Sequence, residues 1–281
     1  MNKTNIAWTD YTWNPVTGCT EVSAGCQNCY ARAMAKRFNG GDFTVKLHQV
    51  VLAEKFPKKP SKIFICSMSD LFHNDVPDSF IGEISRKTYS YPQHTFQILT
   101  KRAERLLAWS NKWKPSGVYG FGRNVHIGVT VENQEMADKR IPLLLRIPAV
   151  VRFLSIEPCL GPIDLRYIKW APIDTSNWPQ KGIVCHSCYD CIAKPEPITS
   201  DTIMLSVHQE LGRIEWVIVG CESGAGRRPC KIEWVESLVE QCKYYGVPVF
   251  VKQLEIAGKV TGDITKFPKH LQIRQWPKEA K

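Results

Sequence analysis

Three cysteines near the N-terminus have the clearest chemical potential in this sequence. Cys19, Cys26 and Cys29 lie together in the segment GCTEVSAGCQNCYA. Iron-sulfur clusters are held by cysteine thiolates on loops, and a cubane bound by only three thiolates keeps one iron open to another ligand. Gly18 and Gly25 each precede one of these cysteines and would let the backbone wrap closely. We therefore expect a 4Fe-4S cluster on the three thiols.

Zinc and unligated thiols are the alternatives for this segment. Zinc usually takes four ligands from paired motifs, and the nearest candidate for a fourth, His48, lies well downstream. Unligated thiols fit less well with a loop placed between a strand and a helix. The spacing favours a cluster over zinc.

A second group of cysteines occurs at a regular three-residue interval. Cys185, Cys188 and Cys191 resemble the bacterial ferredoxin run, with Pro195 where that run has its fourth cysteine. An auxiliary iron-sulfur cluster and a structural zinc site both fit, and unmetallated thiols are the third alternative. The candidates for a fourth ligand are Cys159, His186, His208, Cys221 and Cys230.

Short β-branched or aromatic runs, each followed by a helix-like stretch, indicate the elements that position these residues. This alternation predicts an α/β fold with a parallel sheet and crossover helices. The expected strands are 11–14, 63–67, 95–100, 125–131, 150–156, 216–220 and 247–252, and the first helix is 30–38.

Polar side chains follow nearly every predicted strand. In parallel α/β sheets the loops after the strands open onto one edge, so these side chains should gather there. The alternative is that several cap the following helices or form structural ion pairs. The residues are Ser67, Ser69, Asp70, Lys101, Arg102, Glu132, Asn133, Glu157, Glu222 and Lys252.

Length and composition favour one domain over residues 1–281, with an insertion at about 171–213 that carries the second cysteine group. No apolar stretch is long enough for a membrane span or a signal peptide, so we expect a cytoplasmic protein without a membrane partner. The net charge of +10 favours an anionic partner such as nucleic acid. The alternative is that the basic excess is spread over solvated helices.

Two resemblances extend this reading. The Cys26-x-x-Cys29-Tyr30 ending after a first strand resembles the radical S-adenosylmethionine (SAM) superfamily, although the gap between Cys19 and Cys26 is longer than its common three-residue gap. Eight segments in order resemble a phage- and prophage-associated family known by its three-cysteine motif, which lacks an assigned biochemical function. The segments are WTDYTWNPVTGC, GCQNCYA, KIFICSMSDLFH, LTKR, GVTVEN, RFLSIEP, WVIVGCESG and VPVFVKQ.

The resemblance implies a partial (β/α) barrel, a 4Fe-4S cluster on the three cysteines, and SAM bound to the open iron by its amino and carboxylate groups. Reduction by an external electron donor would cleave SAM to a 5′-deoxyadenosyl radical. Acceptors at the end of the second strand often bind the SAM amino group in this superfamily. The cofactor-binding candidates are Ser67, Ser69 and Asp70 for that amino group, Glu132, Glu157 and Glu222 for ribose or substrate groups, Lys252 for a carboxylate or substrate anion, and Lys101 and Arg102 for a phosphate or carboxylate.

Two functions are consistent with these features. The first is a radical SAM enzyme that acts on a nucleic-acid or nucleotide-derived substrate. The alternative is a non-catalytic phage protein that binds nucleic acid and is stabilised by zinc or iron-sulfur. Trp8, Trp13 and Tyr30 lie close to the cysteine segment and would shield a cluster, stack on a base or pack in the core, and for Trp13 we expect core packing.

Overall fold

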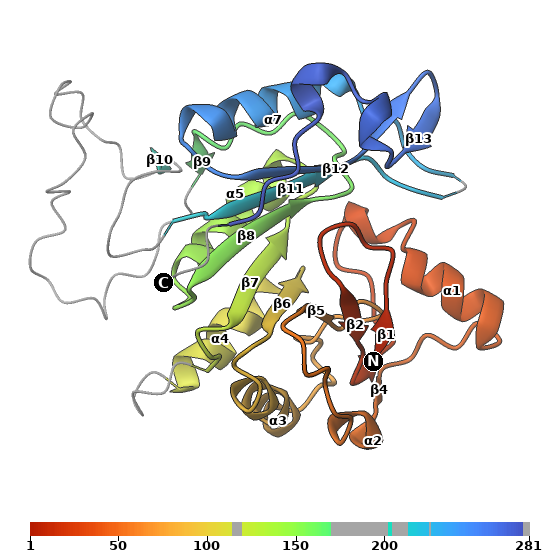
Figure 1. Ribbon diagram of the computed structural model, residues 1–281, viewed down its shortest axis with the longest axis vertical. Coiled ribbons are helices and arrows are strands. Elements are labelled where there is room, and N and C mark those ends of the chain that lie inside the picture. The colour runs from red at the N-terminus through yellow and green to blue at the C-terminus, as the bar shows by residue number, and fades with distance from the viewer. Residues whose placement is uncertain (114–119, 170–201, 204–212, 225, 278–281) are drawn as a thin grey trace, which may run out of the picture.

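The computed structural model describes residues 1–113, 120–169, 202–203, 213–224 and 226–277. Its centre is a nine-stranded sheet in the order β1-β2-β5-β6-β7-β8-β11-β12-β13, which Figure 1 shows as a strongly twisted layer. The strands are β1 (Asn2–Lys3), β2 (Tyr11–Trp13), β5 (Lys62–Ile65), β6 (Thr95–Thr100), β7 (Val125–Thr130), β8 (Val151–Ile156), β11 (Trp216–Gly220), β12 (Val249–Ile256) and β13 (Lys259–Thr261).

The inner strands, from β2 to β12, run parallel, and each pairs with the next one along the chain. Within the nine-stranded sheet, β1 and β13, at the two edges, pair antiparallel with their neighbours. Crossovers between parallel strands are right-handed, so strands in sequential order place their connecting helices on one side. The helices on that side are α3 (Asp78–Tyr89), α4 (Ala103–Trp113), α5 (Gln134–Leu145) and α7 (Ile232–Tyr244).

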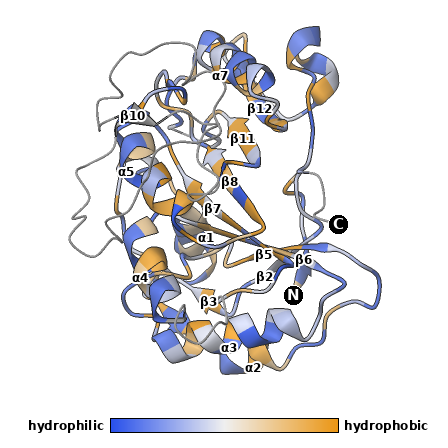
Figure 2. Cartoon of the chain, turned by 90° about the vertical axis from the view of Figure 1, so that its left-hand side faces the viewer, coloured by the Kyte–Doolittle hydropathy of each residue, from blue (hydrophilic) through white to orange (hydrophobic). Residues whose placement is uncertain are grey.

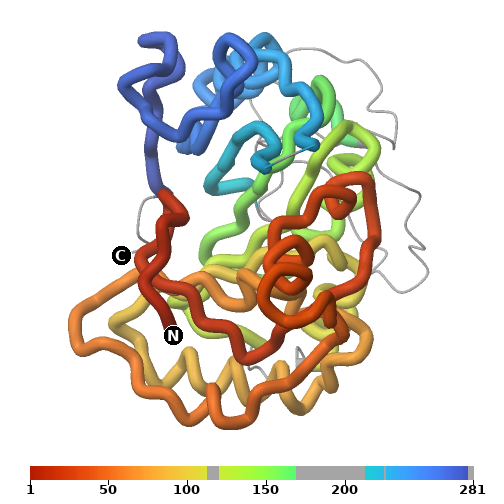
Figure 3. Tube along the Cα trace, turned by 90° about the vertical axis from the view of Figure 1, so that its right-hand side faces the viewer, coloured from red at the N-terminus to blue at the C-terminus, as the bar shows by residue number. Residues whose placement is uncertain are grey.

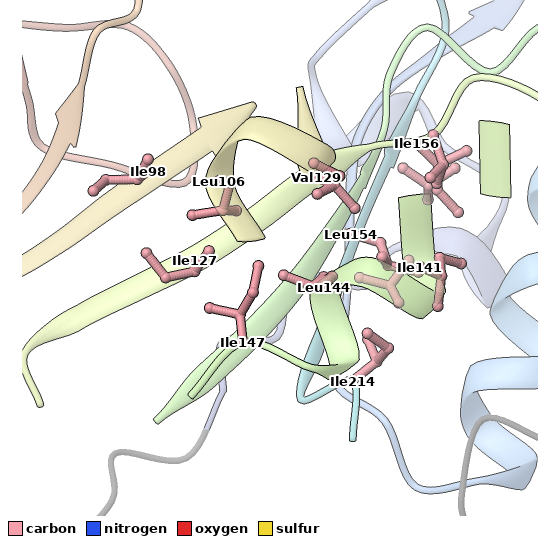
Figure 4. Close-up of a cluster of buried hydrophobic side chains, with 14 of the residues drawn as sticks. Ile98, Leu106, Ile127, Val129, Ile141, Leu144, Ile147, Leu154, Ile156 and Ile214 are labelled. Carbon is pink, nitrogen blue, oxygen red and sulfur yellow. The ribbon is translucent and has the colours of Figure 1, made fainter. Parts of the chain in front are cut away.

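Successive side chains of each strand point to opposite faces of the sheet, so the hydrophobic core is divided between the two faces. On β8, Leu154 joins the large cluster beneath the helices, whereas its neighbour Phe153 joins a smaller cluster on the other face. Figure 4 shows part of the large cluster, which includes Ile127 and Val129 of β7 and Leu144 of α5. Figure 2 shows apolar colour concentrated in the strands.

The smaller cluster fills the face away from the helices, and Trp8 lies at its centre. The Trp8 ring is 4.8 Å from the Phe64 ring and 6.2 Å from the Trp216 ring, measured between centroids. Trp8 is therefore a core residue. Trp13 is fully buried against Phe56, as expected from the sequence.

The shorter elements surround the sheet. β3 (Val16–Thr17) pairs with β4 (Lys46–Leu47). The chain between these two strands contains the three N-terminal cysteines, the 3-10 turn η1 (Ala24–Cys26) and the helix α1 (Tyr30–Phe38). β9 (Ile168–Lys169) pairs with β10 (Thr202–Ile203) and flanks part of the predicted insertion. The remaining elements are α2 (Gln49–Leu52), η4 (Ile264–Lys266) and η5 (Lys269–Leu271).

The predicted α/β class and mostly parallel sheet are confirmed, and the first helix has the expected limits. β5 ends at Ile65 because Cys66 has a φ of 62°, which takes the chain out of the extended region. β12 continues past Lys252 because it forms a hairpin with β13. In the described part of the chain, no helix has the length and apolar character needed to cross a membrane.

Candidate functional site

The cysteine loop, residues 18–29, starts at the C-terminal edge of the sheet. Gly18 donates its N–H to the carbonyl of Met68 at 3.2 Å and forms a bridge with Ser69, in the loop that follows β5. Gly18 has a φ of +82°, and a Cβ there would lie 1.9 Å from the carbonyl oxygen of Thr44. Only glycine fits this position.

Asp70 joins the loops after β5 and β6. Its Oδ1 accepts from the N–H of Phe72 at 3.0 Å and the hydroxyl of Thr100 at 2.6 Å. Its Oδ2 accepts from the N–H of Lys101 at 3.0 Å and Nη1 of Arg102 at 3.2 Å. Helix α3 begins only at Asp78, so Asp70 is not its N-terminal cap. Both carboxylate oxygens of Asp70 are committed to the protein.

Arg102 connects this network to the first cysteine. Its Nη1 lies 3.4 Å from Sγ of Cys19, and its Nη2 donates to the carbonyl of Thr20 at 3.0 Å. Burial raises the pKa of the Cys19 thiol, while the positive charge of Arg102 acts in the opposite direction. The guanidinium would favour a thiolate at this position.

Glu132, after β7, holds the middle of the cysteine loop. Its Oε1 accepts from the N–H of Gly25 at 3.1 Å, and its Oε2 pairs with Nη1 of Arg140 at 2.8 Å. The carboxylate is fully buried, and Arg140 is only 2% exposed. A buried ion pair needs good geometry and further hydrogen bonds to offset desolvation, and the N–H of Gly25 supplies one.

Glu222, after β11, holds the end of the same loop. Its Oε2 accepts from Nδ2 of Asn28 at 2.9 Å, and its Oε1 pairs with Nη2 of Arg228 at 2.5 Å. Arg228 extends to the loop itself, where its Nη1 donates to the carbonyl of Ala24 at 2.9 Å. The net effect of these hydrogen bonds, working against burial, is to lower the pKa of Glu222. Glu222 therefore acts as a bridge to the loop.

Glu157 and Lys252 form an ion pair between β8 and β12, with Oε1 and Nζ 2.5 Å apart. Their side chains are 18% and 22% exposed, so both remain accessible at this edge. Tyr30, the first residue of α1, donates its hydroxyl to the carbonyl of Ser67. Burial, the Cys29 thiol and then Glu157 raise the pKa of the Tyr30 hydroxyl.

The remaining predicted residues divide between structural contacts and open positions. Ser67 donates to Oδ1 of Asn14 at 3.1 Å, and Ser69 donates to the carbonyl of Val16 at 2.8 Å. Asn133 caps α5, accepting from the N–H of Met136 at 3.0 Å. Lys101 is half-buried, and its Nζ lies 3.5 Å from Oγ1 of Thr130. Among the described residues Lys101 has no carboxylate within ion-pair distance.

The three cysteines of the loop are half-buried and free of disulfides. Across the described residues, no three His, Cys, Asp or Glu side chains converge closely enough to hold one metal ion. A cubane is bound differently, because each thiolate ligates a different iron and the sulfurs need not meet at one point. Three half-buried thiols on one loop are a donor set that fits such a cluster. The nearby His73 imidazole is hydrogen-bonded through Nε2 to Oγ1 of Thr20 at 2.8 Å.

Three other cysteines, Cys159, Cys221 and Cys230, lie together at the C-terminal edge. The N–H of Cys159 donates to the carbonyl of Gly220 at 3.0 Å, next to Cys221. The Cys230 thiol donates to Cys159, which lowers the pKa of Cys159 and raises that of Cys230. These were three of the candidate fourth ligands for the second group. Cys185, Cys188, Cys191, His186 and His208 lie outside the described residues.

Comparison with known proteins identifies a family. A family model described as "Protein of unknown function (DUF5131)" matches residues 3–276. The chain belongs to this family. No curated protein and no solved structure matches the DUF5131 chain.

Several residues that help to hold the cysteine loop of this DUF5131 protein at the C-terminal edge of the sheet were not predicted from its sequence. Arg228, Asn28 and Arg140 hold the carboxylates of Glu222 and Glu132. Glu132 precedes α5, and Arg140 lies on that helix eight positions later, which is not the spacing of three or four residues at which charges on one helix pair. Nothing local in the sequence indicates that Asn28 and Glu222 meet.

Proposed function

We propose that this protein is a radical SAM enzyme that binds a 4Fe-4S cluster through Cys19, Cys26 and Cys29 and acts on a nucleic-acid or nucleotide-derived substrate. The proposal includes a partial (β/α) barrel, with the cluster at the C-terminal edge of its strands. One observation carries it. A loop with three free thiols is held over that edge by buried carboxylates from two different strands, Glu132 and Glu222.

The proposal is supported by the number of hydrogen bonds and ion pairs that hold this loop in place. The N–H of Gly25 and the amide of Asn28 reach carboxylates that form ion pairs with Arg140 and Arg228. Such connections restrict the loop before any ligand arrives, which is how a site is preorganised. When bound, the cluster would supply one-electron reduction of SAM at its open iron.

The protein's own groups divide into two sets at this edge. Asp70, Glu132 and Glu222 have their oxygens committed to the protein, so their proposed role is to position the loop and its neighbours. Glu157, Lys252 and Lys101 are left to contact a ligand. Lys101 would bind an anionic group of SAM or substrate, and the partly exposed Glu157–Lys252 pair would accept from hydroxyls or donate to a carboxylate.

Anaerobic purification followed by iron, sulfide and zinc determination tests the proposal. We expect a brown protein with about four irons in a cubane, and formation of 5′-deoxyadenosine when dithionite and SAM are added. Cys26→Ala should lose the iron and that product. Cys242→Ala is the matched control, because it removes a buried free thiol on α7 away from the loop.

The outcomes separate the two candidate functions. A colourless protein that retains zinc and forms no 5′-deoxyadenosine contradicts the enzyme and supports a metal-stabilised binding protein. Full iron content and SAM cleavage in Cys26→Ala would contradict the assignment of the ligands.

A further inference from the structure

Helix α1 directly follows the cysteine loop, and its side chains are mostly exposed. Only Ala31 and Ala35 are buried among its nine residues. Figure 1 places α1 at one side of the molecule, away from the helices that cover the sheet, and Figure 3 turns that side toward the viewer. The helix therefore rests on the protein through two small side chains and the hydroxyl end of Tyr30, and most of its other side chains are exposed.

The outward surface contains a row of large apolar side chains. Tyr30, Met34 and Phe38 are 49%, 45% and 66% exposed and follow one another at intervals of four residues. Residues four apart lie on the same helix face, about 6 Å from each other along the axis. We call these three residues the apolar stripe. Apolar side chains that form one continuous exposed patch often mark an interaction site.

The charges on α1 define the kind of partner. The helix contains Arg32, Lys36 and Arg37 and no acidic residue. Arg32 is paired with Glu21, whereas Lys36 and Arg37 form no ion pair with any described residue. The Arg37 guanidinium lies 5.1 Å from the centre of the Phe38 ring. The stripe therefore has uncompensated positive charge beside it.

We infer that the apolar stripe and the cations beside it bind single-stranded nucleic acid, which would be held next to the cysteine loop. Aromatic faces stack on unpaired bases while lysine and arginine neutralise the phosphates, and both elements occur here on one helix. A second copy of the chain would bring the same positive face and be repelled. This inference rests on the proposed function for its substrate class and adds where and how that class is bound.

The position of the apolar stripe supports its assignment to nucleic-acid binding. Tyr30, the first residue of the stripe, directly follows Cys29, and its hydroxyl donates to the carbonyl of Ser67 in the loop after β5. A strand stacked along the stripe would therefore lead toward the edge that holds Glu157 and Lys252. The chain as a whole has a net charge of +10, which favours approach of a polyanion.

Fluorescence anisotropy with a labelled single-stranded DNA, and with an RNA of the same sequence, tests the inference on the full chain purified with its metal. The variant is R37A/F38A, which removes one cation and one exposed ring. The matched control is K243A/Y244A, which likewise removes one cation and one exposed aromatic ring, at the end of α7, where Tyr244 is 79% exposed. Melting curves and iron content check that both proteins are intact.

We expect saturable binding by the wild type and a loss of at least about tenfold in R37A/F38A. The slope of log affinity against log salt should become shallower by about 0.7 for each lost phosphate contact. The control should bind as the wild type does.

Three results would overturn the inference: no saturable binding by the wild type, equal losses in variant and control, or a dimer in sedimentation that R37A/F38A dissociates. The test is separable from that of the proposed function. SAM cleavage without oligonucleotide binding would contradict only the inference about α1. Oligonucleotide binding by a protein without iron would contradict only the proposed enzyme activity.

Discussion

The backbone N–H of Gly25 donates to the buried carboxylate of Glu132 at 3.1 Å, although 107 positions separate the two residues. A Cβ on Gly25 would lie 3.0 Å from Cδ and Oε1 of Glu132 and 3.3 Å from Cε of Lys101. The cysteine loop therefore approaches the sheet at a place where a side chain would crowd its partner. This contact makes the loop's position dependent on a single residue type.

Gly25→Ala should displace the loop and lower iron content after anaerobic reconstitution, with a small change in the free energy of unfolding. Gly161→Ala is the control, because a Cβ there meets nothing within 4 Å and its φ is not in the left-handed region. Iron and sulfide determination on both proteins measures the effect. Equal iron in the two would mean that the loop tolerates the shift.

Asp70→Ala should lower the free energy of unfolding by about 3–5 kcal/mol, because the buried Arg102 guanidinium would lose its carboxylate. Denaturant titration measures this value. Asp75→Ala is the comparison, since that side chain is 72% exposed and its loss should cost less than about 0.5 kcal/mol. A mild effect of Asp70→Ala on stability, combined with a loss of SAM affinity, would instead assign Asp70 to ligand binding.

Arg228→Gln should accelerate loss of iron to a chelator several-fold, because the Ala24 carbonyl and the Glu222 carboxylate would both lose a donor. The neighbouring Arg227 bonds to the carbonyl of Gly258, outside the cysteine loop. Arg227→Gln is thus a control that removes the same charge. Release at wild-type rate from Arg228→Gln would show that the remaining contacts of the loop hold it without Arg228.

His126→Gln should reduce the acid sensitivity of the fold. Burial lowers the pKa of His126 from 6.5 to about 4. Between these values the unfolded chain binds the proton more readily than the folded protein does. The free energy of unfolding therefore has its full value above pH 6.5. It falls by up to about 1.4 kcal/mol per pH unit on acidification toward the lower pKa. Denaturant titrations at several pH values in this window should give a smaller decrease for His126→Gln. Equal decreases would show that another group is responsible.

Local patterns were sufficient to predict the main elements. β-branched runs such as that of β8, followed by polar and helical stretches, predicted the parallel strands, and the helix after Cys29 has the limits expected. The rule that strand ends share one edge predicted that Glu132 and Glu222 gather there, and in the structure both carboxylates accept hydrogen bonds from the cysteine loop. The spacing of apolar residues is sufficient to predict these elements, because the residues on the buried face of a helix or strand recur with the period of its backbone.

The partners of these residues could not be predicted in the same way. The sequence allowed Glu132 and Glu222 to face a ligand, but Arg140, Arg228 and groups of the loop occupy them. Which side chains meet depends on strand twist and loop course, and contacts between residues such as Asn28 and Glu222 leave no short-range pattern. The position of Trp8 in the core is likewise fixed by neighbours from distant strands.

The pairing of β9 with β10 has a consequence for how this chain can vary. Lys169 lies opposite Thr202, so the two ends of the intervening segment emerge side by side, about 5 Å apart. A segment with adjacent ends can lengthen, shorten or be exchanged without moving the strands on either side. The β9–β10 pair therefore lets the number of residues between Lys169 and Thr202 change while the sheet and the cysteine loop keep their geometry.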